Sequence, residues 1–185
     1  MNLKVETIMK DSPDLVKINH LYNSSFPEKE RIPMWLLLRK SNKDFIDFIA
    51  FYDNDIFVGF AYLISNQDMT YVLYLAINLE VRSKGYGSMA LSKIKVLYPT
   101  NRIILNIEAV DVTASNYEQR LKRKQFYSYN GYKSTTYMIA EYGDSYEVLI
   151  NGNDIKVEEL SSMYRKFMGT VVYLFYKPKF LPVSI

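Results

Sequence analysis

The sequence predicts a mixed α/β fold in which an antiparallel meander is followed by a parallel β-α-β unit. Three strand-like segments, 45–52, 56–64 and 69–79, follow one another with turn-forming residues between them, as is typical of antiparallel neighbours. The third segment is almost wholly apolar and is followed by a helical pattern over 86–97 and an alternating strand over 103–110. A strand, helix and strand in this order form a parallel crossover, so we expect helices on both faces of the sheet.

The residues before the meander are expected to form a strand and two helices. Residues 3–8 have the composition of a short strand. A helix is expected over 12–22, because Ser12 can cap it and a proline follows in the first turn. Residues 26–35 contain two prolines and mixed charges, which is typical of a loop, and lead to a second helix over 34–40.

The residues after the β-α-β unit are expected to form a helix, three strands and one late helix. Ser115 and Glu118 have the spacing of a capping box for a helix over 117–130, and Gly131 stands where a left-handed C-terminal cap is expected. The remaining elements are strands over 132–140, 146–150 and 171–176 and a helix over 157–167.

Length and composition indicate an ordinary globular protein. The chain has 185 residues, 49% hydrophobic and 23% charged, so we expect a single domain over 1–185. The absence of cysteine excludes disulfides and thiolate nucleophiles and favours a reducing compartment such as the cytoplasm. The N-terminus alternates charged and apolar residues, unlike a signal peptide, and no apolar run reaches the ~20 residues that span a bilayer. We therefore expect no association with a membrane.

The charge and the histidine content limit the kinds of ligand. A formal net charge of +3 is too small for a nucleic-acid footprint, although it suits a small anionic ligand. The single histidine, His20, cannot build a histidine metal site, so we expect no metal and a structural or exposed role for this residue. The sequence leaves the oligomeric state open, a homodimer included.

A glycine-containing turn joins the apolar strand to the helix that follows it. The turn consists of Arg82, Ser83, Lys84, Gly85, Tyr86, Gly87 and Ser88. The first amides of a helix have no partner within the helix and carry partial positive charge, and glycines let these donors converge on an anion. The cations and hydroxyls of the turn can add bonds to a phosphate. The turn therefore predicts a phosphate-binding site.

Two familiar phosphate loops do not match this turn. A P-loop ends in Gly-Lys-Ser/Thr, and a dinucleotide fingerprint has a third glycine where this chain has Ala90. A dinucleotide site would also stand first in a doubly wound parallel sheet rather than after a meander. Because Gly-x-Gly alone is a weak motif, an ordinary strand-to-helix turn with solvated cations is the alternative.

Two motifs, in order along the chain, resemble those of the GNAT superfamily of N-acyltransferases. Arg82, Gly85 and Gly87 match the family's acyl-CoA signature Arg/Gln-x-x-Gly-x-Gly/Ala, between a strand and a helix. Asn116, followed by the stretch 126–132 (FYSYNGY), resembles the family's later segment, Asn and then Phe/Leu-Tyr-x-x-x-Gly-Phe/Tyr. Two motifs in the right order are much more specific than either motif alone.

The resemblance covers the element order of residues 3–138 and implies a GNAT fold, whose splayed central strands hold acyl-CoA in a cleft. It implies that the main chain of Ile77 and Leu79 contacts the pantetheine arm and the thioester carbonyl, although the proline that is common in the family before the acidic residue is replaced by Leu79 here. It also implies that the amides of 83–88 hold the pyrophosphate, and that Asn116 faces the pantetheine from the other side. Backbone donors of this kind also suit a developing oxyanion.

The resemblance assigns Tyr127, four residues before Gly131, as the general acid for the departing CoA thiolate. The ordinary pKa of tyrosine, ~10, exceeds that of a thiol, ~8.5, so donation is uphill in solution, but a positioned hydroxyl stabilises the charge as it forms. Because the chain has 17 tyrosines, a packing role is the alternative.

A carboxylate or a water chain has to deprotonate an ammonium substrate before it can attack. Glu108, on a predicted strand beside Asn106, is the first candidate for this base, and Glu80, just before the glycine turn, is the second. The alternative for Glu108 is a partnered carboxylate of the sheet. For Glu80 it is a favourable charge near a helix N-terminus.

Two other features allow competing interpretations. The basic run 120–124 (RLKRK) could bind nucleic acid, but it is more typical of a solvated helix face. Trp35 and the segment 137–144 lie where the acceptor site of the family tends to be walled, and core packing explains Trp35 equally well.

Together these observations predict an N-acetyltransferase that moves an acetyl group from acetyl-CoA directly to a primary amine of a small molecule or a protein. No covalent enzyme intermediate is expected, since no cysteine can carry one. The alternatives are a non-catalytic acyl-CoA-binding or sensing domain and, on the basic run, a nucleic-acid-binding module.

Overall fold

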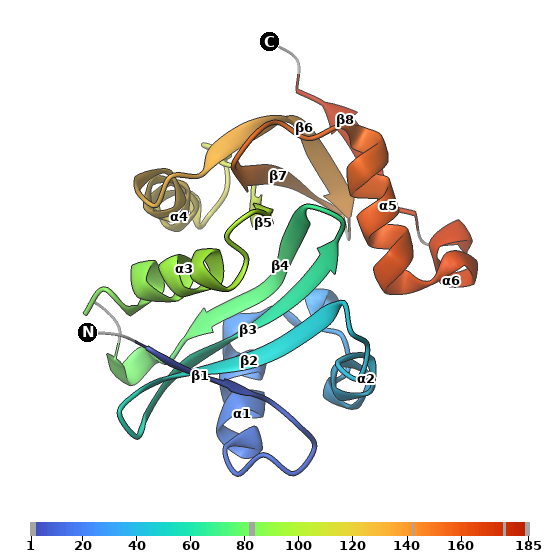
Figure 1. The fold of residues 1–185 in the computed structure, drawn as a ribbon. Coiled ribbons are helices and arrows are strands. Elements are labelled where there is room, and N and C mark those ends of the chain that lie inside the picture. Colours follow the sequence, from blue (N-terminus) through green and yellow to red (C-terminus); the bar gives the residue numbers. More distant parts are fainter. Residues whose placement is uncertain (1–2, 82–83, 142, 176, 184–185) are drawn as a thin grey trace. The chain divides into compact units, whose positions relative to one another are not determined.

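The computed structural model describes residues 3–81, 84–141, 143–175 and 177–183 and shows a mixed α/β fold (Figure 1). Its strands form one sheet in the order β1-β2-β3-β4-β5-β7-β6-β8. The chain divides into two compact units, residues 1–65 with 72–99 and residues 66–71 with 100–185. The elements are β1 (Lys4–Thr7), α1 (Leu15–Ser25), η1 (Glu28–Glu30), α2 (Met34–Lys40), β2 (Ile46–Asp53), β3 (Ile56–Asn66), β4 (Met69–Ile77), η2 (Leu79–Val81), α3 (Tyr86–Leu97), β5 (Arg102–Glu108), α4 (Tyr117–Tyr129), β6 (Lys133–Glu141), β7 (Asp144–Asn151), α5 (Val157–Met168), α6 (Thr170–Phe175) and β8 (Lys179–Pro182).

The first unit contains the predicted meander. Strands β1, β2 and β3 pair antiparallel, with Ala50 opposite Phe60, and β4 follows β3 in the sheet. Aromatic side chains fill the core beside these strands: the rings of Phe48 and Phe60 lie 5.9 Å apart. Tyr22 of α1 packs edge-on against Tyr74 of β4 at 4.9 Å. Burial of these large rings is the main stabilising contribution of the unit.

The second unit contains the start of the predicted parallel crossover. The amide of Arg102, the first residue of β5, donates to the carbonyl of Asp68, directly before β4, at 2.8 Å. The starts of β4 and β5 therefore lie side by side within this unit, and the two strands are neighbours in the order of the sheet. Strand β7 pairs antiparallel with both β5 and β6, and β6 pairs antiparallel with β8.

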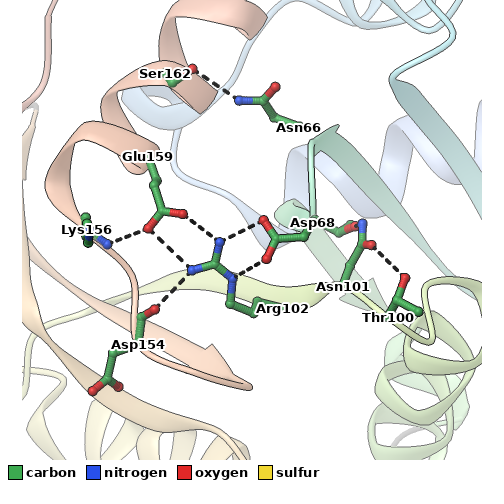
Figure 2. Close-up of polar contacts among 10 residues, drawn as sticks. Asn66, Asp68, Thr100, Asn101, Arg102, Asp154, Lys156, Glu159 and Ser162 are labelled. Carbon is green, nitrogen blue, oxygen red and sulfur yellow. Dashed lines mark hydrogen bonds and ion pairs between the residues drawn. The ribbon is translucent and has the colours of Figure 1, made fainter.

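An arginine at the start of β5 ties several segments of the second unit together (Figure 2). The Arg102 guanidinium contacts both Asp68 oxygens, at 2.8 and 3.0 Å, and Glu159 in the first turn of α5, at 2.7 Å. It also donates to the carbonyl of Asp154 at 3.0 Å. Glu159 accepts in turn from the amide of Lys156, at 2.8 Å, which caps the helix. The contacts of Arg102 thus fix where α5 begins.

The predicted strand over 171–176 is wrong, because Thr170–Phe175 forms the helix α6. The two valines favoured a strand by local propensity, which is a weak signal when tertiary contacts oppose it. Gly169, at φ +84°, ends α5, and the buried Tyr173 hydrogen-bonds through its hydroxyl to Ser161 of α5. The last strand, β8, instead follows at Lys179–Pro182.

Two of the predicted helix caps are also wrong, although α4 begins at Tyr117 as expected. Helix α1 begins at Leu15, because Ser12 uses its hydroxyl to accept from the amide of Met9 at 2.8 Å instead of capping the helix. Helix α4 has Asn116 rather than Ser115 at its N-cap and no side-chain cap bond, so no capping box forms there. Within the part of the chain that the structure describes, no helix is long and apolar enough to cross a membrane.

Candidate active site

The glycine turn follows the last strand of the first unit. Strand β4 ends at Ile77, a single 3-10 turn spans Leu79–Val81, and α3 begins at Tyr86. Gly85 is the N-cap residue, with φ +79° and ψ 2°. L-residues other than asparagine and aspartate rarely adopt this left-handed conformation, so the turn favours glycine at this position. Arg82 and Ser83 lie outside the described residues.

The start of α3 contains main-chain donors that have no acceptor within the helix. The first bond of the helix runs from the amide of Met89 to the carbonyl of Gly85, at 3.1 Å. The amides of 86–88 therefore have no partner within the helix, and they carry the positive end of its dipole. A Cβ built on Gly85 would meet nothing within 4 Å, so its α-carbon faces open space. An anion can approach these donors closely, as the phosphate-site prediction requires.

The side chains of the turn differ in their availability. Tyr86 is buried, and its hydroxyl donates to Asp53 Oδ2 at 2.7 Å, which raises the pKa of Tyr86. Only its main chain is therefore free for a ligand. Lys84 is exposed, and Gly87 and Ser88 are half-exposed.

The residues between β4 and the turn include one anchor that we did not single out from the sequence. The amide of Asn78 donates to the carbonyl of Val58 at 2.8 Å, and its side-chain oxygen accepts from the amide of Glu80 at 3.3 Å. These bonds fix the main chain between Ile77 and Leu79. The side chains of Leu79 and Glu80 are both exposed.

The second unit brings two predicted site residues, Glu108 and Asn116, together. Glu108 lies 3.1 Å from both Arg120 and Arg123 of α4, and it accepts from Asn116 at 3.5 Å. The side-chain oxygen of Asn116 accepts from Arg120 Nε at 2.7 Å. Both oxygens of Glu108 are thus occupied by donors, as in a partnered sheet carboxylate. This cluster joins the end of β5 to the first turns of α4.

Tyr127 is half-buried on α4, beside the rings of Phe126 and Tyr132. Its ring is 5.7 Å from that of Tyr132, and its hydroxyl has no hydrogen-bond partner among the described residues. Burial raises the pKa of Tyr127 to about 12. The helix ends in a Schellman motif at Gly131, φ +81°, where the amide of Tyr132 donates to the carbonyl of Tyr127. This confirms the predicted left-handed cap and fixes the position of Tyr127 relative to Tyr132.

A buried polar cluster in the same unit involves Asn106, whose role the sequence did not reveal. Its side-chain amide donates to the Tyr164 hydroxyl of α5 at 2.9 Å, and that hydroxyl lies 3.1 Å from the hydroxyl of Tyr71. The side-chain oxygen of Asn106 is buried and has no partner among the described residues. The alternation of β5 had indicated only that Asn106 faces away from its apolar neighbours.

The structure bears on the alternative interpretations of the basic run 120–124 and of Trp35. Three cations of the basic run are engaged: Arg120 and Arg123 with Glu108, and Lys124 with Glu147 at 2.8 Å. The side chains of Arg123 and Lys124 are nevertheless 38% and 40% exposed, so the run lies on a solvated helix face, as expected, with three of its cations in ion pairs. Trp35 is 64% exposed, so core packing does not explain it.

Two further predictions concern histidine and metal. His20 is exposed on α1, which agrees with the exposed rather than the structural role that the sequence allowed. No group of three or more His, Asp and Glu side chains in the described ranges is arranged to hold a metal ion.

The sequence and the fold both match known acetyltransferases. A sequence profile of the acetyltransferase (GNAT) family matches residues 15–120, which is more than half of the chain. None of the curated proteins matches the sequence at a significant level. Many solved structures share the fold.

Three of these structures illustrate how similar the known structures are in sequence and in fold. A GNAT-family protein from Bacteroides thetaiotaomicron is 21% identical, covers 92% of this chain and 98% of its own, and has a TM-score of 0.72. The ribosomal-protein-S18-alanine N-acetyltransferase of Escherichia coli is 12% identical over 84% and 97%, with a TM-score of 0.62. An aminoglycoside 6'-N-acetyltransferase, complexed with coenzyme A, is 14% identical over 80% and 95%, with a TM-score of 0.60.

At these identities the structures support the fold, and the family assignment rests on the sequence profile, whose match includes the glycine turn. The chain belongs to the acetyltransferase (GNAT) family.

Proposed function

We propose that this protein transfers an acetyl group from acetyl-CoA directly to a primary amine of a small molecule or a protein. The observation that carries the proposal is the start of α3: Gly85, at φ +79°, leaves its α-carbon in open space beside the amides of 86–88, which have no partner within the helix. These donors suit the pyrophosphate of coenzyme A. The coenzyme A bound to the aminoglycoside acetyltransferase of the same fold supports this choice of donor.

The reaction begins when the neutral amine attacks the thioester carbonyl carbon. A carbon–nitrogen bond forms while the carbonyl oxygen becomes an oxyanion, which a main-chain amide near Ile77 or Leu79 stabilises. The carbon–sulfur bond then breaks, and the CoA thiolate takes a proton from Tyr127. The amine nitrogen gives up its own proton to a base. Because no covalent enzyme intermediate forms, the amine and acetyl-CoA must be bound together.

The base must be a carboxylate that can accept a proton without first losing a hydrogen-bond donor. Glu108 already accepts from two guanidiniums and Asn116, so it would have to lose a donor before taking a proton. Its role as base stays a prediction, and we propose that it positions α4 and Asn116. Glu80 is exposed, lies in the same unit as the glycine turn and makes no side-chain bond with a described residue. We therefore propose that Glu80, directly or through water, removes the proton.

A second function is acyl-CoA binding without turnover. The two observations that favour it are the paired state of Glu108 and the pKa of Tyr127, about 12, which makes proton donation less favourable. Release of CoA in the presence of amines distinguishes this alternative from a transferase.

The phosphate site is tested by placing a side chain in the open space at Gly85. Asparagine tolerates left-handed backbone, so Gly85→Asn preserves the helix start while blocking the approach of the pyrophosphate. We expect at least about a tenfold loss of affinity for acetyl-CoA, measured by calorimetry. Gly143→Asn is the matched control, because Gly143 has φ +83° and also faces open space. Equal affinity of both variants and the parent protein would refute the proposed phosphate site.

A further inference from the structure

The loop after α1 carries a cation whose bonding is incomplete. Arg31 lies between η1 and α2, and its Nη1 donates to Asn23 of α1. Its Nε–H is buried and has no acceptor among the described residues. None of the ion pairs in the described part of the chain involves Arg31.

The main chain on either side of Arg31 is held by two buried tyrosines. Tyr74 of β4 donates to the carbonyl of Glu30 at 2.7 Å and accepts from the amide of Ile32 at 3.2 Å. Tyr22 of α1 donates to the carbonyl of Ile32 at 3.0 Å. The tyrosine rings are only 2% and 5% exposed, so both sides of the loop are anchored in the core. Arg31 is therefore positioned before any ligand binds.

An unpaired guanidinium N–H that water does not reach is costly, so its position calls for an acceptor. The Nε and Nη2 atoms form one edge of the guanidinium, which matches the two oxygens of a carboxylate in a bidentate pair. Asn23 contacts the opposite corner, Nη1, and no other described residue bonds to this edge. A carboxylate that reaches the edge would complete the bonding of Arg31.

The loop is attached to the strand that leads to the proposed acetyl-transfer site. Tyr74, which holds Glu30, lies three residues before Ile77 on β4, a distance of about 10 Å along the strand. We propose, on the basis of the proposed function, that Arg31 binds a carboxylate of the acceptor. The acceptor is then an amine that also carries an acid group, such as an amino acid or a peptide. A polycationic amine would instead place like charge beside the guanidinium.

The experiment compares acceptors that differ only in this acid group. Amino acids and their carboxamides, together with one aminoglycoside, are tested for CoA release, and the same pairs are tested for binding by calorimetry. We expect the acids to be preferred over their amides by about tenfold or more in kcat/KM. Arg31→Gln removes this preference by lowering kcat/KM for the acids about tenfold, leaves the amides within about twofold, and does not change KM for acetyl-CoA.

Two further variants separate the charge and the geometry of Arg31 from general effects. Arg31→Lys keeps the charge without the bidentate edge, so we expect it to recover only part of the preference. Arg39→Gln removes the same charge from an exposed position on α2, so we expect it to behave like the parent protein. Unchanged circular dichroism and thermal midpoints verify that each variant is folded.

The contrary outcomes are distinct from a failure of the proposed function. Equal use of acids and amides, or an equal loss of both in Arg31→Gln, would overturn the carboxylate site. If acetyl-CoA binds but no amine is acetylated, the calorimetric comparison decides, and the absence of Arg31-dependent binding of the acids overturns the inference. If acetyl-CoA itself does not bind, the proposed function has failed, while the same binding comparison still tests Arg31.

Discussion

Nη2 of Arg102 lies 2.7 Å from Oε1 of Glu159, and this ion pair joins the start of β5 to the first turn of α5. The same guanidinium contacts Asp68, before β4. Hydrogen bonds from Arg102 hold the pKa of both carboxyls below their ordinary values. A lowered carboxyl pKa contributes stability that is present above the unfolded-state pKa and is lost as the pH falls through the folded-state value.

Replacing Arg102 tests this stabilising role. We expect Arg102→Met to lower the free energy of unfolding at pH 7 by about 2 kcal/mol, because it leaves the partly buried Glu159 without its partner. In the parent protein, stability should fall below the ordinary glutamate pKa of 4.5, and this fall should be shallower in the variant. Urea unfolding between pH 3 and 8 measures both effects, with exposed Arg165→Met as the control. An identical acid dependence in all three proteins would contradict this role.

Gly59 is predicted to be intolerant of any side chain. A Cβ at this position of β3 would lie 2.2 Å from the carbonyl oxygen of Ala76 and 3.0 Å from the α-carbon of Ile77. Both contacts are with backbone, so relief requires the strands to separate. We expect Gly59→Ala to lower the free energy of unfolding by about 2–3 kcal/mol. Gly59 has no left-handed φ, so backbone strain does not contribute to the loss. An unchanged free energy of unfolding in Gly59→Ala would show that β4 accommodates the added methyl group.

The sequence predicted those parts of the fold that local patterns determine. The meander follows from apolar alternation and turn residues, and the crossover follows from an apolar strand and an amphipathic helix. The left-handed cap at Gly131 was also predicted, since glycine is the residue that adopts such backbone at little cost, whereas the left-handed backbone of Gly85 is visible only in the structure. Helix α6 could not be predicted either, because its two valines locally favour a strand. Its position depends on Tyr173, which is buried and hydrogen-bonds to α5.

The contacts of the candidate site depend on tertiary structure that no local pattern encodes. In the sequence, Glu108 is a carboxylate on a predicted strand whose partners cannot be identified. The structure shows that these partners are Arg120 and Arg123, which belong to the basic run 120–124. The unpaired Nε of Arg31 cannot be recognised without the two tyrosines that hold its loop. These interactions join residues far apart in the chain, so their pairing is visible only in the folded protein.

The two candidate bases can be separated by parallel substitution. We expect Glu108→Gln to lower the free energy of unfolding by about 1–3 kcal/mol, because two guanidiniums lose their partner. It should leave the pH profile of kcat/KM in place. We expect Glu80→Gln to remove the acidic limb of that profile while stability stays within about 0.5 kcal/mol. A profile that shifts in Glu108→Gln alone would instead identify Glu108 as the base.

Tyr127→Phe tests the general acid. The substitution keeps the ring against Tyr132 and removes a hydroxyl that bonds to no described residue, so we expect the fold to be retained. We expect kcat to fall by about 10–100-fold with little change in KM for acetyl-CoA, because the departing thiolate loses its donor. Tyr129→Phe, an exposed position two residues further along α4, is the matched control.

The pH dependence gives an independent reading of the same hydroxyl. Because burial raises the pKa of Tyr127 to about 12, the phenol stays protonated well above pH 10, where an ordinary tyrosine ionises. The alkaline limb of kcat that this group causes should therefore lie above pH 10 and disappear in Tyr127→Phe. If kcat and its pH profile are the same in both proteins, the acid is another group. If both proteins bind acetyl-CoA but neither releases CoA with any amine, the protein binds acyl-CoA without turnover. In that case no thiolate departs, so Tyr127 does not act as a proton donor.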